Sequence, residues 1–377
     1  MKQRSDVIVV GGGAIGLSTA FELAQEGVSV RLLEKGRCGR EASWAGAGMI
    51  IPGNSLKART PEARLRSLSY ELWPDLTDKL QSQTDVDSEF CICGGLEVQF
   101  EQSPMSSDVQ RWQDDGIEAA LLSPNALAQL EPRCSRKLRS GYHLPAMAQV
   151  RNPRHLRALQ AACVSSGVQI EESTEVVGFT TPNGRVTEVQ TSGGSFVSNS
   201  VCICSGAWTS QLLQGTRFAF PIQPVRGQMV MLKCNPLPFG HIIQMGPRYL
   251  VPRSDGRALI GSTEEWVGFE KRTTAGAVAG LIDFATSVIP DLADATIERT
   301  WAGLRPGSPD GVPFIGLVPG LENMFVAAGH FRNGLQNSPG TARFLRQLVL
   351  DQAPSLNPAD FVHTQTDSPT PEVTEVV

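Results

Sequence analysis

A glycine-rich turn near the N-terminus and an acidic residue downstream of it form a pattern suited to binding a dinucleotide. Gly11, Gly13 and Gly16 give the spacing GxGxxG directly after an apolar run. The first glycine permits a tight turn, the second lets the backbone approach a pyrophosphate, and the third lets a helix pack closely on a strand. Glu34 follows at the sequence separation typical of the acid that bonds a ribose hydroxyl. A carboxylate in that position would repel a 2′-phosphate. The pattern therefore predicts a dinucleotide site that disfavours NADP.

The elements around this turn are expected to hold it at one end of a parallel sheet. The run from Asp6 to Val10 is nearly all apolar, as in a strand buried on both faces. A helix is predicted over residues 14–25, ending at Gly27, and a second strand over residues 28–33. Strand, turn, helix, strand and terminal acid thus follow in the order of a nucleotide-binding βαβ unit.

Two further segments bear on which dinucleotide binds. Residues 41–49 form a loop of small residues that suits close contact with a flat ligand, although an ordinary surface loop has the same composition. Near the C-terminus an apolar strand over 323–328 breaks at Gly329, and a helix is predicted to start with Ser338 as N-cap and Pro339 in its first position. Such a helix N-terminus would stabilise negative charge on a reduced flavin. This second feature favours FAD over NAD.

Composition excludes several other classes of protein. The 377 residues include 33 Lys+Arg and 38 Asp+Glu, and the resulting net charge of −5 argues against nucleic-acid binding. No apolar run reaches the roughly 18 residues that span a bilayer, so no integral membrane segment is expected. The short apolar run after the basic N-terminus lacks a small-residue cleavage site, which favours a cytoplasmic protein.

The eight cysteines are too dilute to predict a disulfide framework. Cys91/Cys93 and Cys202/Cys204 form two Cys-Ile-Cys pairs. Because residues i and i+2 of a strand share a face, each pair is interpreted as two small apolar residues of a core. No CxxC spacing accompanies them and the five histidines are scattered, so no metal site is predicted.

Further motifs extend over nearly the whole chain. The most specific are WAGLRPG at 301–307 and AGHFRNG at 328–334. The others are EASWAGAGM at 41–49, CSGAW at 204–208, PVRGQ at 224–228, YLVPR at 249–253 and GST at 261–263. Together with the N-terminal turn they resemble the D-amino-acid oxidase/glycine oxidase family of FAD-dependent amine oxidases. The similarity is greatest to the bacterial glycine oxidases that serve thiamine thiazole biosynthesis.

The resemblance implies an α/β (α+β) fold of the p-hydroxybenzoate-hydroxylase type with non-covalent FAD. In this fold a Rossmann-like FAD-binding domain is interleaved with an antiparallel-sheet substrate domain. The FAD-binding domain is expected to comprise residues 1–85, 145–215 and 300–363, and the substrate domain residues 86–144 and 216–299. The tail over 364–377 contains no Lys or Arg and no core pattern, and is predicted to be disordered. A homo-oligomer, a tetramer by family analogy, is expected.

The resemblance also implies roles for individual residues. Arg305 would bind the carboxylate of the substrate, with Tyr249 and Arg332 near it. The residues in contact with FAD would be Gly11, Gly13, Ala14, Ile15 and Gly16 at the pyrophosphate turn, Glu34 and Lys35 at the ribose, Ala42, Ser43, Ala47, Gly48 and Met49 towards the flavin, Val176 at the adenine, Gly206, and His330, Phe331, Arg332, Asn333, Gly334, Leu335 and Gln336 along the isoalloxazine.

The chemistry of an amino-acid substrate agrees with these roles. Its carboxylate must be fixed, and a bidentate guanidinium does this best, although an arginine in a Pro/Gly-rich turn is often solvated or structurally paired. His330 is expected to contribute through its backbone rather than as a general base. Glu264, Gln336 and Asn337 depart from the more apolar residues of the family, which leaves the substrate preference open.

The implied reaction transfers a hydride from the substrate Cα to flavin N5, after which the imine is hydrolysed to a 2-oxo acid and ammonia and O2 is reduced to hydrogen peroxide. Glycine would give glyoxylate. Three alternatives stay open: a D-amino-acid or sarcosine oxidase of the same fold, a dehydrogenase that passes electrons to a quinone or carrier, and a flavin-binding sensor without turnover. A membrane-docking segment expected of the dehydrogenase is not evident, and the presence of Arg305 and Tyr249 speaks against the sensor.

Overall fold

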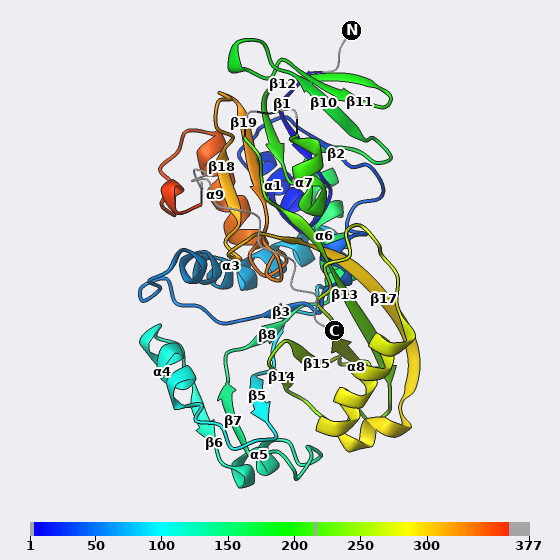
Figure 1. The fold of residues 1–377 in the computed structure, drawn as a ribbon. Coiled ribbons are helices and arrows are strands. Elements are labelled where there is room, and N and C mark those ends of the chain that lie inside the picture. Colours follow the sequence, from blue (N-terminus) through cyan, green and yellow to red (C-terminus); the bar gives the residue numbers. More distant parts are fainter. Residues whose placement is uncertain (1–3, 215, 217, 362–377) are drawn as a thin grey trace.

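The chain forms two large β-sheets, one in the upper and one in the lower part of Figure 1, in a computed structural model that describes residues 4–214, 216 and 218–361. Within these residues each large sheet has eight strands, and a separate small sheet has three. The predicted disordered tail over 364–377 lies outside the described residues.

The first sheet has a parallel centre, as predicted. Its strands are β1 (Arg4–Val10), β2 (Val30–Leu33), β9 (Gln169–Glu171), β10 (Val176–Thr180), β11 (Glu188–Thr191), β12 (Gly194–Ile203), β18 (Phe314–Leu317) and β19 (Met324–Ala328). They follow the order β10-β11-β12-β1-β2-β9, with β19 beside β12 and β18 beside β19. The pairs that join β9, β2, β1, β12 and β19 are parallel, whereas β10, β11 and β18 are attached by antiparallel pairs.

Both ends of the chain build this sheet. Helix α1 (Ala14–Gln25), which has the predicted bounds, follows β1 and packs against α9 (Ser338–Val349), which follows β19. α9 begins one residue earlier than predicted, because Asn337 rather than Ser338 is its N-cap. The Ser338 hydroxyl instead donates to the carbonyl of Leu335 at 2.8 Å.

The remaining α-helices surround the sheets. They are α2 (Ala42–Ala45), α3 (Pro61–Thr84), α4 (Ser106–Asp114), α5 (Pro124–Leu130), α6 (Asn152–Ser165), α7 (Thr209–Leu212) and α8 (Ala275–Val288). Over the part of the chain that the structure describes, no helix combines the length and apolar character needed to cross a bilayer.

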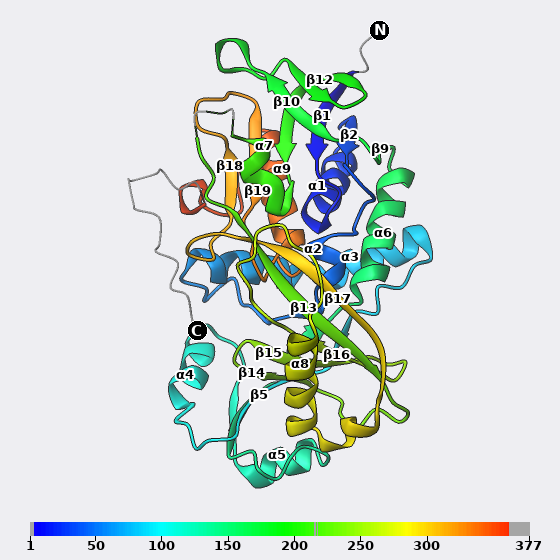
Figure 2. The same ribbon diagram turned by 45° about the vertical axis from the view of Figure 1, so that its right-hand side comes forward.

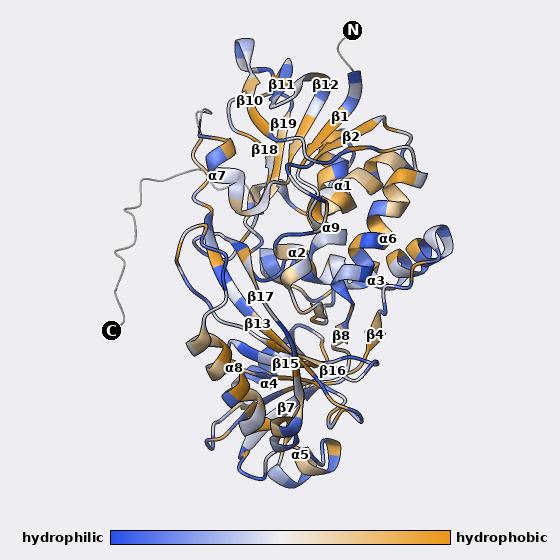
Figure 3. Cartoon of the chain, turned by 90° about the vertical axis from the view of Figure 1, so that its right-hand side faces the viewer, coloured by the Kyte–Doolittle hydropathy of each residue, from blue (hydrophilic) through white to orange (hydrophobic). Residues whose placement is uncertain are grey.

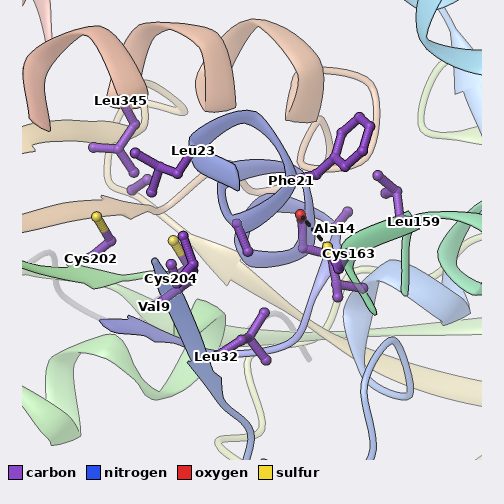
Figure 4. Packing of buried hydrophobic residues seen from close by; sticks show 14 of the residues in the cluster. Val9, Ala14, Phe21, Leu23, Leu32, Leu159, Cys163, Cys202, Cys204 and Leu345 are labelled. Carbon is purple, nitrogen blue, oxygen red and sulfur yellow. Dashed lines mark hydrogen bonds between the residues drawn. The ribbon is translucent and has the colours of Figure 1, made fainter. Parts of the chain in front are cut away.

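Alternate residues of β1 face opposite sides of the first sheet. Val7 and Val9 are buried among α1, α6 and α9, whereas Ile8 and Val10 are buried in a separate cluster on the other side. Figure 4 shows Val9 next to Cys204 beside α1, and Figure 3 shows apolar residues concentrated along the central strands. The strand is therefore buried on both faces, as its sequence predicts.

The second sheet is largely antiparallel, as predicted. Its strands are β5 (Gly95–Gln99), β6 (Ala120–Leu122), β7 (Ser140–Leu144), β13 (Gln223–Lys233), β14 (Ile242–Met245), β15 (Arg248–Pro252), β16 (Arg257–Gly261) and β17 (Thr296–Gly307). The order is β17-β13-β16-β15-β14-β5-β7-β6, in which β14 and β5 pair in parallel. β13 and β17 run side by side in Figure 2, paired as far as Gly307. The expected domain boundary at residue 300 therefore falls inside a strand of this sheet.

The small sheet has the order β3-β8-β4, formed by β3 (Met49–Ile50), β8 (Ala148–Gln149) and β4 (Cys91–Ile92). Its edge strand shows that the core interpretation of the cysteines is wrong for one pair. Cys202 and Cys204 are buried as predicted, but Cys91 is exposed and Cys93 is half-buried. The reason is that β4 is the edge strand beside β8, so Cys91 lies at a sheet edge that faces solvent.

Candidate active site

A cavity of about 550 Å³ brings together residues from both ends of the chain and from the second sheet. The predicted site residues that line it are Gly11, Gly13, Ala14, Ile15, Glu34, Lys35, Ala42, Ser43, Ala47, Gly48, Met49, Val176, Gly206, Tyr249, Arg305 and the run from His330 to Gln336. Gly16 is the one member of the predicted set that does not line the cavity.

The glycine turn between β1 and α1 is shaped by close backbone contacts. Gly11 has a φ of +107°, and a Cβ atom there would strike the carbonyl of Cys204. A Cβ atom on Gly16 would strike the carbonyl oxygen of Gly11, so Gly16 serves helix packing rather than the cavity wall. Gly13 faces the cavity, where a Cβ atom would lie 3.3 Å from the Ser43 hydroxyl. The turn thus exposes bare backbone to a ligand, at the positive end of α1.

The acid at the end of β2 is fixed by backbone amides. Glu34 accepts hydrogen bonds from the amide of Gly12 at 2.7 Å and from the amide of Gly36 at 2.8 Å. The ammonium of the adjacent Lys35 lies 3.3 Å from the ring centre of Trp208, and burial lowers the pKa of Lys35. An acid and a cation on an aromatic ring therefore border the same end of the cavity.

The small-residue loop after Glu34 lies against the start of α1. The Ala14 amide donates to the Ser43 hydroxyl at 2.9 Å, and the side-chain amide of Asn152 donates to the Ser43 carbonyl at 2.8 Å. The Asn152 Oδ1 atom is buried without a hydrogen-bond partner among the described residues. Gly48 has a φ of +71°, and any Cβ there would strike the carbonyl of Val150. This loop holds its place only with glycine at that position.

At the other end of the cavity, Arg305 of β17 presents a buried guanidinium. Its two terminal nitrogens donate to the Thr263 carbonyl at 3.1 Å and to the Ser262 hydroxyl at 2.5 Å. Burial lowers the pKa of the Arg305 guanidinium, which remains a cation because its ordinary pKa is far above neutrality. The guanidinium is packed over Gly227 of β13.

Tyr249 of β15 stands beside this cation. Its ring lies over Gly261 of β16, where a Cβ atom would overlap the ring. The buried hydroxyl donates to the sulfur of Met229 at 3.3 Å, and the phenol interacts electrostatically with Arg305. Two glycines on neighbouring strands thus make room for the two side chains that would meet a substrate.

Arg332 is the most exposed of the three predicted substrate residues. It donates to the Pro247 carbonyl at 2.9 Å and pairs with the carboxylate of Glu264 at 3.4 Å. About a third of each of these two side chains is exposed, at 30% and 37% respectively. Glu264 does not line the cavity; it forms its ion pair with Arg332 at the rim.

Residues 330–336, which follow β19, are fixed by hydrogen bonds to neighbouring elements. His330 is buried, its Nε2 atom lies 3.0 Å from the Thr341 hydroxyl, and burial lowers its pKa to about 3. Burial thus makes this imidazole a weak base, and its Nε2 atom is engaged by Thr341. The Trp73 indole donates to the carbonyl of Gln336 at 2.9 Å, and the Phe331 amide donates to the carbonyl of Pro306, also at 2.9 Å.

Several lining residues were missed by inspection of the sequence, among them Asn152, Trp208, Gly227, Met229, Gln244 and Gly303. Trp208 lies within the CSGAW motif and Gly227 within the PVRGQ motif, so these two motifs could have indicated that both residues belong to the site. Gly303 lies within WAGLRPG, and a Cβ there would strike the Ala45 side chain, which keeps β17 close to α2. Asn152 had no such signal.

The comparisons with known proteins agree with this site. A family model described as FAD dependent oxidoreductase matches residues 6–348. This chain belongs to the FAD-dependent oxidoreductase family. Its cofactor is therefore FAD, and both the family and the fold that the motifs predict are confirmed.

The most informative relatives of this oxidoreductase cover nearly all of it. It is 35% identical over 360 residues to the glycine oxidase of Pseudomonas putida, covering 94% of this chain and 97% of that protein. It is 34% identical over 360 residues to the bifunctional protein ThiO/ThiG of Synechocystis, covering 93% of this chain and 52% of that protein. The crystal structure of glycine oxidase from Geobacillus kaustophilus superposes with a TM-score of 0.91 at 32% identity, covering 97% of this chain and 100% of that chain.

The cavity residues of this oxidoreductase fit FAD. Bare backbone at Gly13 and the absence of acidic residues in the first turn of α1 suit a pyrophosphate. The buried Oδ1 atom of Asn152 needs a hydrogen-bond donor, and the edge of a flavin or a ribose hydroxyl supplies one. Glu34, already held by two amides, keeps lone pairs for a ribose hydroxyl.

Proposed function

We propose that this oxidoreductase oxidises glycine with O2 to glyoxylate, ammonia and hydrogen peroxide, with sarcosine or small D-amino acids as further substrates. The observation that carries the proposal is the guanidinium of Arg305. It is bonded to the neutral oxygens of Ser262 and Thr263 and forms no ion pair with a carboxylate among the described residues. Such a cation is available to bind the carboxylate of an amino acid through two hydrogen bonds. Similarity to glycine oxidases over nearly the full length supports glycine as that amino acid.

In the proposed mechanism Arg305 holds the substrate carboxylate, with Tyr249 and Arg332 beside it. The Tyr249 hydroxyl donates to the Met229 sulfur, a weak acceptor, so little is lost when it turns to a substrate oxygen. Bound FAD supplies the two-electron acceptor for the substrate Cα–H bond and the route of these electrons to O2. The apolar side chains of Met49 and Met229 restrict water around the substrate. The protein thus acts by orientation and by binding charge.

For FAD we propose the contacts implied by the family. Glu34 and Lys35 would hold the adenosine ribose, the turn at Gly11–Ile15 the pyrophosphate, and Val176 the adenine. Ala42, Ser43, Ala47, Gly48 and Met49 would face the flavin side of the cofactor, and residues His330 to Gln336 would line the isoalloxazine. Their common position around one cavity supports this assignment. Gly16 would act indirectly, by letting α1 approach the turn.

The experiment that tests the proposal is a visible spectrum of the purified protein combined with a peroxide assay in air. Glycine, sarcosine, D-alanine and D-proline are compared. Flavin absorption and peroxide release from glycine are expected. A colourless protein that takes up no FAD would overturn the proposal.

The same assay separates the alternatives. Peroxide from sarcosine or D-alanine without peroxide from glycine would indicate an amino-acid oxidase of other specificity. Bleaching of the flavin by glycine in air without peroxide would indicate a dehydrogenase that uses another electron acceptor. The same assay without any amine gives the background rate of peroxide release.

We further propose that the reaction serves thiamine thiazole biosynthesis, which the similarity to the ThiO/ThiG protein supports. The wild-type chain should restore growth without thiamine to a bacterium whose own glycine oxidase is deleted, whereas the Arg305→Ala variant should not. Equal growth with both would contradict this role.

The assembly and domain organisation are also proposals. By family analogy the chain forms a cytoplasmic homotetramer, which light scattering of the purified protein would test. The FAD-binding domain is proposed to comprise 1–85, 145–215 and 300–363, and the substrate domain the residues between. Membership of the two large sheets supports this division, except that β17 crosses the boundary at 300; the small sheet joins β4 of the substrate domain to β3 and β8 of the FAD-binding domain.

A further inference from the structure

Cys91 and Cys93 form a pair of thiols at the surface of the small sheet. Cys91 is the exposed one of the eight cysteines, and its neighbour Ile92 is 61% exposed. Cys91 is paired with Gln149 across the small sheet, and the Gln149 side-chain amide donates to the Cys93 sulfur at 3.4 Å, so both cysteines lie against the same residue. An exposed thiol and a half-buried thiol two residues further along the chain therefore lie at the same sheet edge.

The surroundings of this pair favour negative charge on sulfur. The Gln149 amide donates to the Cys93 sulfur at 3.4 Å, and its oxygen accepts from the Arg253 guanidinium at 2.7 Å. Arg253 is buried, donates otherwise only to the carbonyls of Val150 at 3.0 Å and Ala47 at 2.8 Å, and forms no ion pair among the described residues. A buried cation without a carboxylate partner thus stands behind the thiols.

The two thiols differ in acidity. The neighbouring Cys93 thiol lowers the pKa of Cys91 to about 7; Arg253 and Gln149 act in the same direction, while burial and Glu89 oppose them. Cys91 and burial in turn raise the pKa of Cys93. Cys91 is therefore the nucleophile of the pair at neutral pH.

We propose that Cys91 and Cys93 form a peroxide-responsive dithiol, oxidised to a disulfide by the hydrogen peroxide that the enzyme produces. The Cys91 thiolate attacks one peroxide oxygen, the O–O bond breaks, and the other oxygen leaves as hydroxide and is protonated to water. The sulfenic acid formed on Cys91 is attacked by Cys93, so that the S–S bond forms and the S–O bond breaks. The Cys93 proton leaves with that oxygen as a second water. Two thiols and one peroxide thus give one disulfide and two waters.

This inference rests on the proposed function only for the source of the peroxide. The thiols are connected to the cofactor cavity through Gln149, Arg253 and the carbonyl of Ala47, a residue that lines it. The pair thus lies within a short chain of hydrogen bonds from the place where peroxide would form.

The test uses the reduced holoenzyme in two arms, one with glycine in air and one with added hydrogen peroxide, each with and without catalase. Free thiols are then alkylated under denaturing conditions and the peptides are analysed by mass spectrometry. A Cys91–Cys93 disulfide is expected in both arms and is expected to be lost with catalase. Cys91 should react on the order of tenfold faster than the half-buried Cys234.

Two variants separate the roles of the thiols. Cys93→Ser should stop at a sulfenic acid on Cys91 that dimedone traps, whereas Cys91→Ser should give neither product. Cys234→Ser is the matched control and should still form the disulfide. Failure of added peroxide to form the Cys91–Cys93 disulfide would overturn the inference. Disulfide formation with added peroxide but not with glycine would leave the dithiol standing and count against the proposed oxidase activity.

Discussion

The guanidinium of Arg305 in β17 lies directly over Gly227 in β13. A Cβ atom on Gly227 would overlap the guanidinium group. In the strand register Gly227 is paired with Gly303, which lies two residues before Arg305. The Arg305 side chain and the vacant Cβ position of Gly227 are therefore on the same side of the sheet. β13 therefore lacks a side chain where the cation lies flat on the sheet.

Gly227→Ala should weaken substrate binding, because the new methyl group displaces the guanidinium from its position. We expect KM for glycine to rise about tenfold, which corresponds to about 1.4 kcal/mol. Steady-state kinetics of the holoenzyme measure the effect. Gly280→Ala, at a helix position with open space around it, is the control and should leave KM unchanged. An unchanged KM in Gly227→Ala would mean that the guanidinium is not positioned by this contact.

Arg305→Ala should remove the partner of the substrate carboxylate while FAD remains bound. Loss of a buried charged contact costs about 2–5 kcal/mol, so kcat/KM should fall about thirtyfold or more, mainly through KM. Arg305→Lys keeps the charge without the fork and should lie between Ala and wild type. Arg133→Ala, which removes an exposed arginine paired with Asp291, is the control. Loss of FAD from Arg305→Ala would place this residue at the cofactor instead.

Gly16→Ala should destabilise the protein and reduce its FAD content, although Gly16 does not line the cavity. Its Cβ would strike the Gly11 carbonyl, so α1 must move away from the turn. Overpacking of this kind costs about 1–3 kcal/mol. Thermal unfolding and the flavin-to-protein absorbance ratio are the measurements. Gly193→Ala, which has open space around it, should change neither; equal losses in both variants would refute the steric argument.

Glu97 should make stability depend on pH. It accepts a hydrogen bond from the Gly246 amide at 2.8 Å, and burial raises its pKa to about 7. Because this pKa lies above the ordinary value of 4.5, the folded state favours the protonated carboxyl. Its contribution is complete below that ordinary value and is lost as pH rises through about 7.

The variant that tests this is Glu97→Gln, which keeps the acceptor and removes the charge. It should raise the melting temperature above that of wild type at alkaline pH, by the equivalent of about 1–3 kcal/mol, and have little effect in acid. Glu118→Gln, at an exposed position, is the control. A gain that is the same at both pH values would show that ionisation of Glu97 is not its cause.

The parts of the site that the sequence predicts are those governed by local geometry. The turn at Gly11–Gly16 and the acid Glu34 follow from steric demands over a few residues, and α1 has the predicted bounds. Asn152 could not be found in this way, because its bond to Ser43 joins positions 109 apart in the chain. The same holds for Cys91, since its exposure depends on which strands flank β4.

One wall of the cavity is made late during synthesis. The ribosome delivers the glycine turn early, but β19 and the residues from His330 to Gln336 follow long after it. FAD is therefore expected to bind only after Gln336 has been synthesised. A polypeptide terminated before β19 lacks this wall and is expected not to retain FAD. Under the proposed function, such a truncated product would therefore release no peroxide.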